Sequence, residues 1–392
     1  MQKNMLIAQS GGPTMVINQS LAGAVLAARK QKQIGTIFGA KHGIQGILNR
    51  DFVNLSNIPQ SKIKTVAQTP SSALGSVRRK PTPQDCKAIF EVLDEQNIGY
   101  FFYIGGNDSA ETVHIIHEAA RAAGSSLRCF HIPKTIDNDL RENDHTPGFG
   151  SAARFVACAF IGDDLDSRAL GGVKVNIVMG RHAGFLTAAS ALARKTPSDG
   201  PHLIYLPERP FSLDQFTDDV KSVYKKYGRC VIAVSEGIAD AKGEPIAARF
   251  SEEVDSHGNK QLSGTGSLGD FLASEIKKQT GISRVRADTF GYLQRSFPGI
   301  ASKVDMQEAY QVGETAVHAA LKGLTSGSIA IRRNKGDVYG VTYKPVPLRN
   351  VARETRHMPA SFINKAGNDV TAAFMRYVTP LVGPLPKTAL LY

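Results

Sequence analysis

Residues 133–139, PKTIDND, place two aspartates two positions apart, behind a lysine and a threonine. In an extended chain residues i and i+2 point to the same side, so we expect Asp137 and Asp139 to face one direction. Two carboxylates this close repel each other unless a cation or a substrate proton lies between them. One proton acceptor and one Mg²⁺ ligand would suit phosphoryl transfer, with Lys134 neutralising phosphate oxygens. The alternative is a polar turn, which Asp and Asn also favour.

Two glycine-rich segments have the composition of phosphate-binding loops. SGGP (10–13) follows an apolar run and precedes an amphipathic stretch, so backbone amides and a helix N-terminus would favour an anion. A plain tight turn is the alternative. IGGNDSAE (104–111) has the same arrangement, but Asp108 and Glu111 also have the spacing of a capping box, which would give both acids a structural role.

Further charged and aromatic residues follow later apolar runs. They are Arg181 in MGRHAG (179–184), Glu236 in SEG (235–237), and Tyr292 and Arg295 in GYLQR (291–295). Arginine binds phosphate through two parallel hydrogen bonds. Each of these residues alone could lie on the surface, but their shared position after apolar runs favours one binding site.

Two common nucleotide-binding motifs are excluded. GTGSLG (264–269) fits G-x-G-x-x-G, but no apolar strand precedes it, so we reject a dinucleotide site there. The sequence contains no G-x-x-x-x-G-K-[ST], which excludes a P-loop ATPase at the level of the motif.

Apolar runs alternate with segments of helical periodicity, which predicts βαβ units and parallel sheets covered by helices on both faces. We expect strands within 4–10, 100–106, 127–133, 173–180, 202–208 and 229–237, and helices near 16–28, 109–123, 183–194 and 212–226. Ligands bind at the carboxyl ends of such strands, where the motifs lie. The break between two series falls near 140–150, residues 239–267 form a polar excursion, and the tail after about 333 stays unassigned.

Length and composition agree with a soluble, globular protein of two domains. A chain of 392 residues is long for one core, and 42% hydrophobic with 21% charged residues is typical of globular proteins. The net charge of +12 would suit nucleic acid or small polyanionic substrates, and the absence of a basic stripe interleaved with aromatics favours small substrates. No apolar run has a membrane helix's length and no signal peptide is evident, so we expect a cytoplasmic protein without membrane or nucleic-acid partners.

The four cysteines are widely spaced and form no C-x-x-C pair, so we expect reduced, buried thiols rather than a zinc or redox site. They are Cys86, Cys129, Cys158 and Cys230.

Taken together, the segments SGGP, LGSVR, IGGNDS, PKTIDND, VMGRHAG, SEG and GYLQR resemble, in this order, the phosphofructokinase family over about residues 5–325. TIDND followed by MGR is the most specific part. The resemblance implies an α/β fold of two Rossmann-like domains. One, of residues 1–145 plus about 288–335, would bind the phosphoryl donor, and the other, of 146–287 plus part of the tail, the sugar phosphate.

The resemblance also implies Mg²⁺-dependent phosphoryl transfer to the 1-hydroxyl of fructose 6-phosphate, giving fructose 1,6-bisphosphate. Asp137 would match the general base, with Thr135, Lys134 and Arg181 as its catalytic partners. The donor would be bound by Gly12, Arg78, Asp108 and Lys134, and Mg²⁺ by Asp108 and Asp139. The sugar phosphate would be bound by Thr135, Asp137, Met179, Gly180, Arg181, Glu236, Arg286, Tyr292 and Arg295. Arg286 matches an arginine that reaches a neighbouring subunit's site, so a homodimer or homotetramer is expected.

Two positions separate the donors within the family. ATP users generally carry glycine where this chain has Asp108 and Lys134, whereas pyrophosphate users carry aspartate and lysine. A carboxylate at 108 occupies the room that the α-phosphate of ATP needs, and a lysine at 134 suits compact pyrophosphate. The resemblance therefore implies the pyrophosphate-dependent type, which Tyr292, often histidine in ATP users, also favours. An ATP-dependent enzyme is the alternative, and a non-catalytic sugar-phosphate or nucleic-acid binding protein is the alternative from another class.

The chain departs from the family pattern at two places. Asn107 stands where the family often has aspartate, which removes one possible Mg²⁺ ligand. Gly172 stands where an intersubunit arginine is common, and Lys174 is the nearest cation. The sequence leaves open dimer or tetramer, sedoheptulose 7-phosphate as a second acceptor, and any allosteric site.

Overall fold

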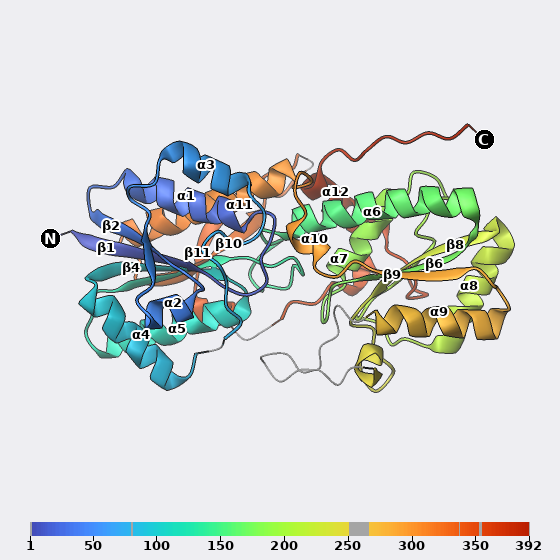
Figure 1. Cartoon of the computed structure of the whole chain (residues 1–392), viewed down its shortest axis with the longest axis horizontal. Coiled ribbons are helices and arrows are strands. Elements are labelled where there is room, and N and C mark those ends of the chain that lie inside the picture. Colours follow the sequence, from blue (N-terminus) through green and yellow to red (C-terminus); the bar gives the residue numbers. More distant parts are fainter. Residues whose placement is uncertain (1, 80, 251–265, 337, 353–354, 392) are drawn as a thin grey trace. The chain divides into compact units, whose positions relative to one another are not determined.

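The computed structural model describes residues 2–79, 81–250, 266–336, 338–352 and 355–391. The chain divides into two compact units (Figure 1). The first contains Met1–Ile136, Leu140–Phe149 and Arg295–Arg356, and the second contains Asp137–Asp139, Gly150–Gln294 and His357–Tyr392. The tail through Arg356 thus belongs to the first unit. The assignment of a donor domain and a sugar-phosphate domain stays a prediction.

The first unit is built on a mainly parallel sheet in the strand order β11-β10-β5-β4-β1-β2-β3. Its strands are β1 (Lys3–Gln9), β2 (Ile34–Ala40), β3 (Phe52–Asn54), β4 (Ile98–Gly105), β5 (Arg128–Pro133), β10 (Ser326–Arg333) and β11 (Val341–Val346). The edge strands β3 and β11 pair antiparallel with their neighbours, and the inner strands run parallel.

Helices cover both faces of this sheet, as Figure 1 shows. They are α1 (Ile17–Arg29), α2 (Ile44–Leu48), α3 (Gln60–Gln68), α4 (Pro83–Glu95), α5 (Asn107–Ala122) and α11 (Lys303–Leu321), with a short 3₁₀ turn η3 (Leu348–Asn350). Side chains of α1, α3 and α11 form one core with the sheet, and those of α2, α4 and α5 form the other. Along β1, Met5 and Ile7 enter the first core and Leu6 the second, because successive strand residues point to opposite faces.

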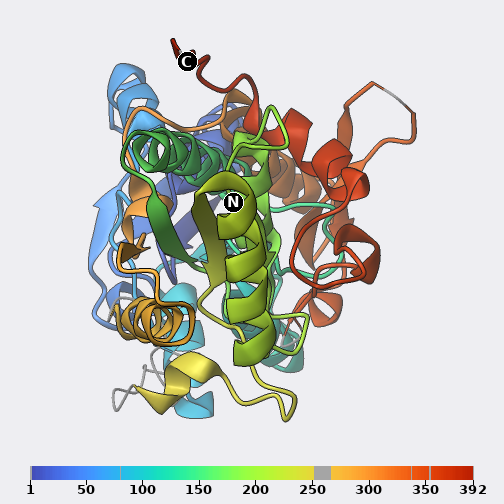
Figure 2. The ribbon, with the colours of Figure 1, turned by 90° about the vertical axis from the view of Figure 1, so that its right-hand side faces the viewer.

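The second unit contains a parallel sheet in the order β7-β8-β6-β9. Its strands are β6 (Gly172–Val178), β7 (Leu203–Tyr205), β8 (Arg229–Ser235) and β9 (Val285–Thr289). The helices α8 (Leu213–Tyr227) and α9 (Ser267–Thr280) pack on one face, and α6 (Phe149–Leu170) lies on the other (Figure 2). The remaining elements are α7 (Phe185–Ala188), η1 (Ala189–Ala193), η2 (Ile246–Arg249), α10 (Leu293–Ser296), η4 (Ala360–Phe362) and α12 (Ala372–Val382).

The predicted α/β class with mainly parallel, helix-covered sheets is confirmed, and the helices expected at 16–28 and 109–123 match α1 and α5 within two residues. The single helix expected at 183–194 is wrong. The chain there forms the short α7 and continues as the 3₁₀ turn η1. Most of the polar excursion at 239–267, and the first two residues of GTGSLG, lie outside the described residues.

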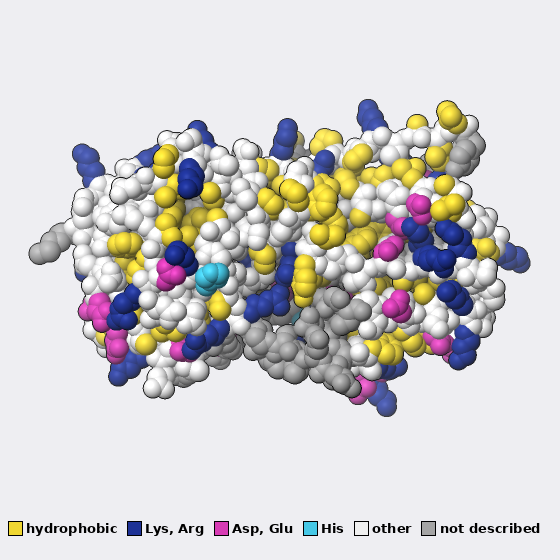
Figure 3. All heavy atoms as spheres, viewed as in Figure 1, with side chains coloured by type: hydrophobic (Ala, Val, Ile, Leu, Met, Phe, Trp, Pro, Cys, Tyr) yellow, Lys and Arg dark blue, Asp and Glu magenta, His cyan; other side chains and the backbone are white. Residues whose placement is uncertain are grey.

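The state of the cysteines, the character of the helices and the distribution of charge can also be compared with the predictions from the sequence. The four cysteines are free thiols, of which Cys158 is partly exposed and the other three are buried. No helix in the described part of the chain has the length and apolar character to cross a bilayer. On the face in Figure 3, lysine and arginine side chains stand singly or in small groups, several of them beside aspartate or glutamate.

Candidate active site

The loops after β1, β4 and β5 meet at one edge of the first sheet. β4 pairs with both β1 and β5, with Ile104 opposite Gln9 and Gly105 opposite Pro133. The chain leaves β1 toward β2 on one side, whereas β4 lies on the other side, so β1 and β4 flank a topological switch point. Ligands bind at such points in open α/β sheets. SGGP, IGGND and PKTIDND all begin there.

Two serines join the first two of these loops. The Ser10 hydroxyl donates to the carbonyl oxygen of Ile104 at 3.0 Å, and Ser10 Oγ lies 2.5 Å from Ser109 Oγ. A Cβ at Gly105 would lie 2.0 Å from Ser109 Oγ, so no side chain fits between the loops. Glycine at residue 105 therefore lets the two loops come close enough for the serine hydroxyls to meet.

Lys134 extends from the third loop to the first. Its side chain is 4% exposed, and Nζ donates to the carbonyl oxygen of Gly12 at 2.6 Å. Its backbone N–H donates to the Gly105 oxygen at 2.9 Å, which joins the second loop to the third. The structure thus brings together Gly12 and Lys134, two of the residues that sequence assigned to the donor.

Arg295 approaches Gly12 as well. Its Nη1 atom lies 2.6 Å from the position that a Cβ on Gly12 would occupy, so a side chain at residue 12 would displace the guanidinium. Two cationic side chains therefore converge on one glycine of the first unit. The sequence placed Arg295 with the sugar phosphate, and that role stays a prediction.

His131 supports this edge and was missed by the sequence analysis. It is fully buried, with Nε2 2.9 Å from the Gly105 oxygen and Nδ1 2.8 Å from the Ser328 hydroxyl. Burial lowers the pKa of His131 to about 4, so the ring is neutral near pH 7. It then donates from Nε2 to Gly105 and accepts at Nδ1. The available signal was a histidine inside the apolar run directly before PKTIDND.

Asp108 lies in the first turn of α5, but not as a cap. The N-cap residue is Gly106, which has no capping side chain, so the capping box considered for Asp108 and Glu111 is wrong. The capping box of this unit joins Thr82 and Asp85 in α4 instead. The segment before Arg78 is attached to Gly11: the Ser76 hydroxyl donates to the Gly11 oxygen at 2.6 Å, and the Gly11 N–H donates to the Val77 oxygen. Arg78 itself is exposed.

The segment PKTIDND is not an extended strand. Asn138 has φ of +61°, in the left-handed region that asparagine tolerates, and its side-chain amide donates to the Tyr377 hydroxyl at 2.7 Å. The expectation that Asp137 and Asp139 face one side by strand alternation is therefore wrong, because the chain turns between them. Both aspartates are partly exposed.

Thr135 is held by the loop that follows. Its N–H donates to the Pro147 oxygen at 3.2 Å, and its own oxygen accepts the Thr146 hydroxyl at 3.0 Å. Gly148 has φ of +111°, and a Cβ there would lie 3.2 Å from the Thr135 oxygen. Both backbone groups of Thr135 are thereby fixed by residues 146–148.

The predicted sugar-phosphate residues Met179, Gly180, Arg181 and Glu236 come together in the second unit. They follow β6 and β8, which pair so that Val178 lies opposite Ser235. The Glu236 N–H donates to the Val178 oxygen at 2.9 Å, and the Ser235 hydroxyl donates to the Gly180 oxygen at 2.6 Å. A Cβ on Gly237 would lie 2.0 Å from the Arg181 oxygen, so the SEG loop packs directly on the backbone that carries Arg181.

Two further residues support the Arg181 loop without having been predicted. Glu208 Oε1 accepts the N–H groups of Gly184 at 2.8 Å and Met358 at 3.0 Å, and burial raises the pKa of this carboxyl. Gln294 Oε1 accepts the Met179 N–H at 3.3 Å. Met358 belongs to the tail that the sequence left unassigned, so part of that tail holds this loop.

The other predicted residues lie in more open positions. Tyr292 is 47% exposed, and Arg286 is exposed on the edge strand β9. The Lys174 ammonium pairs with Asp163 at 2.5 Å and Asp166 at 2.9 Å within its own chain. A role of Arg286 or Lys174 in a neighbouring subunit stays a prediction.

The described residues contain no group of three or more His, Cys, Asp and Glu side chains placed to hold a metal ion. Mg²⁺ does not need such a group, because it commonly binds through one or two carboxylates together with substrate phosphates and water. Asp108, beside the glycine loops of the first unit, and Asp139, in the second, are the candidate carboxylates.

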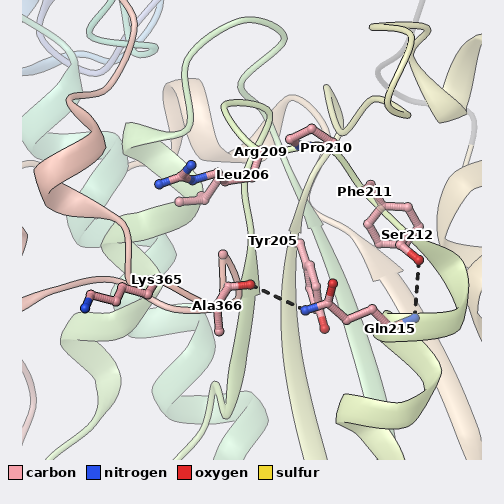
Figure 4. Close-up of a pocket in the computed structure, with 10 residues that line it drawn as sticks. Tyr205, Leu206, Arg209, Pro210, Phe211, Ser212, Gln215, Lys365 and Ala366 are labelled. Carbon is pink, nitrogen blue, oxygen red and sulfur yellow. Dashed lines mark hydrogen bonds between the residues drawn. The ribbon is translucent and has the colours of Figure 1, made fainter.

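A separate cavity of about 190 Å³ lies in the second unit between the β7–α8 loop and residues 365–367 (Figure 4). Arg209 and Lys365 line it, and the Gln215 side chain crosses to the Ala366 oxygen. None of the predicted site residues lines this cavity.

Comparison with known proteins agrees with the motifs. The sequence profile described as phosphofructokinase matches residues 4–320. A pyrophosphate–fructose 6-phosphate 1-phosphotransferase of Rhodospirillum rubrum is 58% identical over 97% of this chain and 94% of its own length. One of Xanthomonas campestris is 40% identical over 97% and 91%. A crystal structure of pyrophosphate-dependent phosphofructokinase from Marinobacter aquaeolei superposes with a TM-score of 0.88 at 33% identity, covering 99% of this chain and 93% of that one. The chain belongs to the phosphofructokinase family.

Proposed function

We propose that this protein reversibly transfers a phosphoryl group from pyrophosphate to the 1-hydroxyl of fructose 6-phosphate, giving fructose 1,6-bisphosphate and phosphate. The contact between Lys134 and Gly12 carries the choice of donor. A lysine that is 4% exposed, with Nζ 2.6 Å from the oxygen of Gly12, supplies a positive charge in the loop that follows β1. A positive charge at this place can neutralise phosphate oxygens of a diphosphate donor.

Arg295 and the glycines strengthen this choice. Its guanidinium approaches Gly12 from a second direction, so two cations can neutralise a compact, highly charged donor. Asp108, in the first turn of α5, adds bulk and negative charge where family members with ATP as donor have glycine. The two named relatives that share most of this chain are both pyrophosphate enzymes.

The remaining residues take the roles that their positions allow. Asp137 accepts the proton of the 1-hydroxyl as it attacks the phosphoryl group, and Thr135 lies two residues before it on a fixed backbone. Arg181 and Glu236, on loops packed against each other, bind the sugar phosphate together with Met179 and Gly180. The proposed sugar-phosphate ligands also include Arg295, Tyr292 and Arg286. Transfer then depends mainly on positioning and neutralisation of charge.

Magnesium would be held by Asp108 and Asp139 with phosphate oxygens of the donor. When bound, Mg²⁺ neutralises charge on the transferring group. Asn107, an amide where the family often has a carboxylate, leaves this metal with fewer protein charges. We further propose a cytoplasmic homo-oligomer in which Arg286, exposed on β9, reaches the neighbouring subunit. Exchange of one phosphoanhydride for a phosphate ester lies near balance, so the reaction would serve both glycolysis and gluconeogenesis.

Initial rates with fructose 6-phosphate and either pyrophosphate or ATP test the proposal. We expect turnover with pyrophosphate and little with ATP. The double variant Asp108→Gly, Lys134→Gly should relax this preference, because it restores the glycines of ATP users. Robust turnover of the wild type with ATP alone would refute the choice of donor, and no turnover with either would favour a non-catalytic binding protein.

A further inference from the structure

A buried group of charged side chains lies behind the loop that holds Thr135. His145 is 2% exposed, with Nδ1 2.8 Å from Asp144 Oδ1 and Nε2 2.6 Å from Glu308 Oε2. Tyr339 donates its hydroxyl to the other oxygen of Glu308, and Arg333 lies 3.1 Å from Asp144 and stacks over the Tyr339 ring. We call these five residues the His145 cluster. All of them belong to the first unit.

The geometry determines the protonation state of His145. Both ring nitrogens face carboxylate oxygens, which only accept hydrogen bonds, so both nitrogens must carry hydrogen for both contacts to form. With both carboxyl groups ionised, the imidazolium cation satisfies this, and the Tyr339 hydroxyl lies farther from Nε2, at 3.3 Å. Burial alone would lower the pKa of His145, but its hydrogen bonds to Asp144 and Glu308 and their charges together raise it above its usual value.

The cluster and the residues beside it fix the 143–148 loop to strand β10 and helix α11. The Asp144 N–H donates to the Ile331 oxygen at 2.9 Å, and the Ile331 N–H donates to Asn143 Oδ1 at 3.0 Å, which joins the loop to β10. The His145–Glu308 contact joins the loop to α11, and the Gly148 N–H donates to Asp305 of the same helix at 2.9 Å. Residues 146–148 of this loop then hold both backbone groups of Thr135.

We propose that His145 is a positioning residue for phosphoryl transfer: its imidazolium, held between Asp144 and Glu308, fixes the loop that holds the backbone of Thr135, the residue next to Lys134. The proposal rests on the activity proposed above. Loss of the second proton leaves one nitrogen lone pair facing a carboxylate, so the loop loses an attachment and gains a repulsion. Turnover should therefore fall at alkaline pH as His145 deprotonates.

The charged groups around the imidazole ring affect the titration of His145. Asp144 and Glu308 favour the cation, whereas Arg333 is attached to Asp144 and partly balances its charge. Burial and Glu308 raise the pKa of the Tyr339 hydroxyl, so it stays protonated and keeps its hydrogen bond to Glu308. Asp305 on α11 and Arg356, which donates to the Asn143 oxygen, lie along the same loop.

The decisive variant is Glu308→Gln, tested in the whole protein. Its amide oxygen can still accept from His145, and its amide nitrogen can donate to the Tyr339 oxygen, so the contacts persist while the charge is lost. The pH at which kcat falls to half on the alkaline side should move down by at least about one unit, the size of shift that a neighbouring carboxylate causes. At pH 6, kcat should stay within about threefold of the wild type. Glu314→Gln, the same change elsewhere on α11, is the matched control and should leave the profile unchanged.

Histidine Cε1–H resonances followed by NMR provide a readout that does not depend on activity. Comparison with His145→Gln assigns the His145 signal, which should remain that of an imidazolium at pH 7 and titrate at lower pH in Glu308→Gln. Three results would overturn the proposal. His145 could be neutral at pH 7, the alkaline fall in kcat could occur at the same pH in Glu308→Gln as in the wild type, or Glu308→Gln could lose kcat equally at every pH. If the wild type does not use pyrophosphate, the proposed function fails instead, and the profile with the donor that is used still decides the role of His145.

Discussion

Lys134→Met is the substitution that tests the donor site most directly. Methionine has a similar length and fits a buried position, but it has no charge and no hydrogen to donate to Gly12. Two unit charges about 4 Å apart interact by about 4 kcal/mol at an effective dielectric constant of about 20. Removal of a single group that stabilises transition-state charge typically costs about 3–4 kcal/mol. Since about 1.4 kcal/mol corresponds to a factor of ten in rate, we expect kcat with pyrophosphate to fall by about 10²–10³-fold.

Stability should change far less than activity in this variant. The lost hydrogen bond from a charged donor is worth about 1.5–3 kcal/mol, but an apolar side chain also removes the cost of burying an ammonium group. Urea denaturation measured beside the initial rates separates the two effects. Lys41→Met is the matched control, because Lys41 is about half exposed and its ion pair with Asp51 at 2.8 Å is of the weak surface kind. A kcat of Lys134→Met within about fivefold of the wild type, in a folded protein, would refute the role given to this cation.

The remaining predictions concern the base, a backbone contact and acid stability. Asp137→Ala should lower kcat by about 10²–10⁴-fold with a small change in the KM for fructose 6-phosphate, and unchanged kcat would remove Asp137 as the base. Gly237→Ala should raise that KM, because its Cβ would lie 2.0 Å from the Arg181 oxygen. Gly162→Ala, where no described atom beyond the backbone of its own helix α6 comes within 4 Å, should leave kinetics unchanged; equal KM values in both would contradict the packing argument. His131 titrates near pH 4 when folded and near 6.5 when unfolded, so it contributes full stability above pH 6.5 and loses up to about 3 kcal/mol as the pH falls toward 4. The difference in unfolding free energy between the wild type and His131→Gln should therefore shrink from pH 7.5 to 4.5, and a constant difference would count against a buried neutral ring.

The sheet architecture was predictable because buried parallel strands are marked by continuous apolar runs. The runs before SGGP, IGGND and MGR correspond to β1, β4 and β6, and the candidate site residues follow each strand end. Their register across each sheet then places the loops side by side without further information. Residues predicted on neighbouring loops, such as Gly12 and Lys134, were therefore found close together in the structure.

Contacts between distant residues were not predictable in this way. Glu308 lies 163 residues from His145, and neither stands beside a glycine loop or has a spacing that indicates the other. Glu208 and Met358 meet across a similar distance. Asn138 illustrates a local failure: the sequence DND allowed a turn and an extended segment, and the bond from Asn138 to Tyr377 in the tail accompanies the left-handed backbone. Such choices depend on partners that the local pattern does not contain.

The glycines of the candidate site show why a motif and its physical cause can differ. The sequence analysis interpreted them as places where a ligand approaches the backbone. At Gly105 and Gly237, however, the atoms that would meet a Cβ belong to Ser109 and to the Arg181 backbone, so these glycines are required by contacts within the protein. Gly12 is intermediate, because the neighbouring atom is the guanidinium of Arg295, itself a candidate ligand for phosphate. At Gly106 the nearest atom beyond the flanking residues is the Lys134 oxygen, 4.0 Å from the Cβ position, so the described part of the chain leaves room for a side chain. Ligand approach at Gly106 stays a prediction; this glycine is the N-cap of α5, where backbone N–H groups can bind a phosphate.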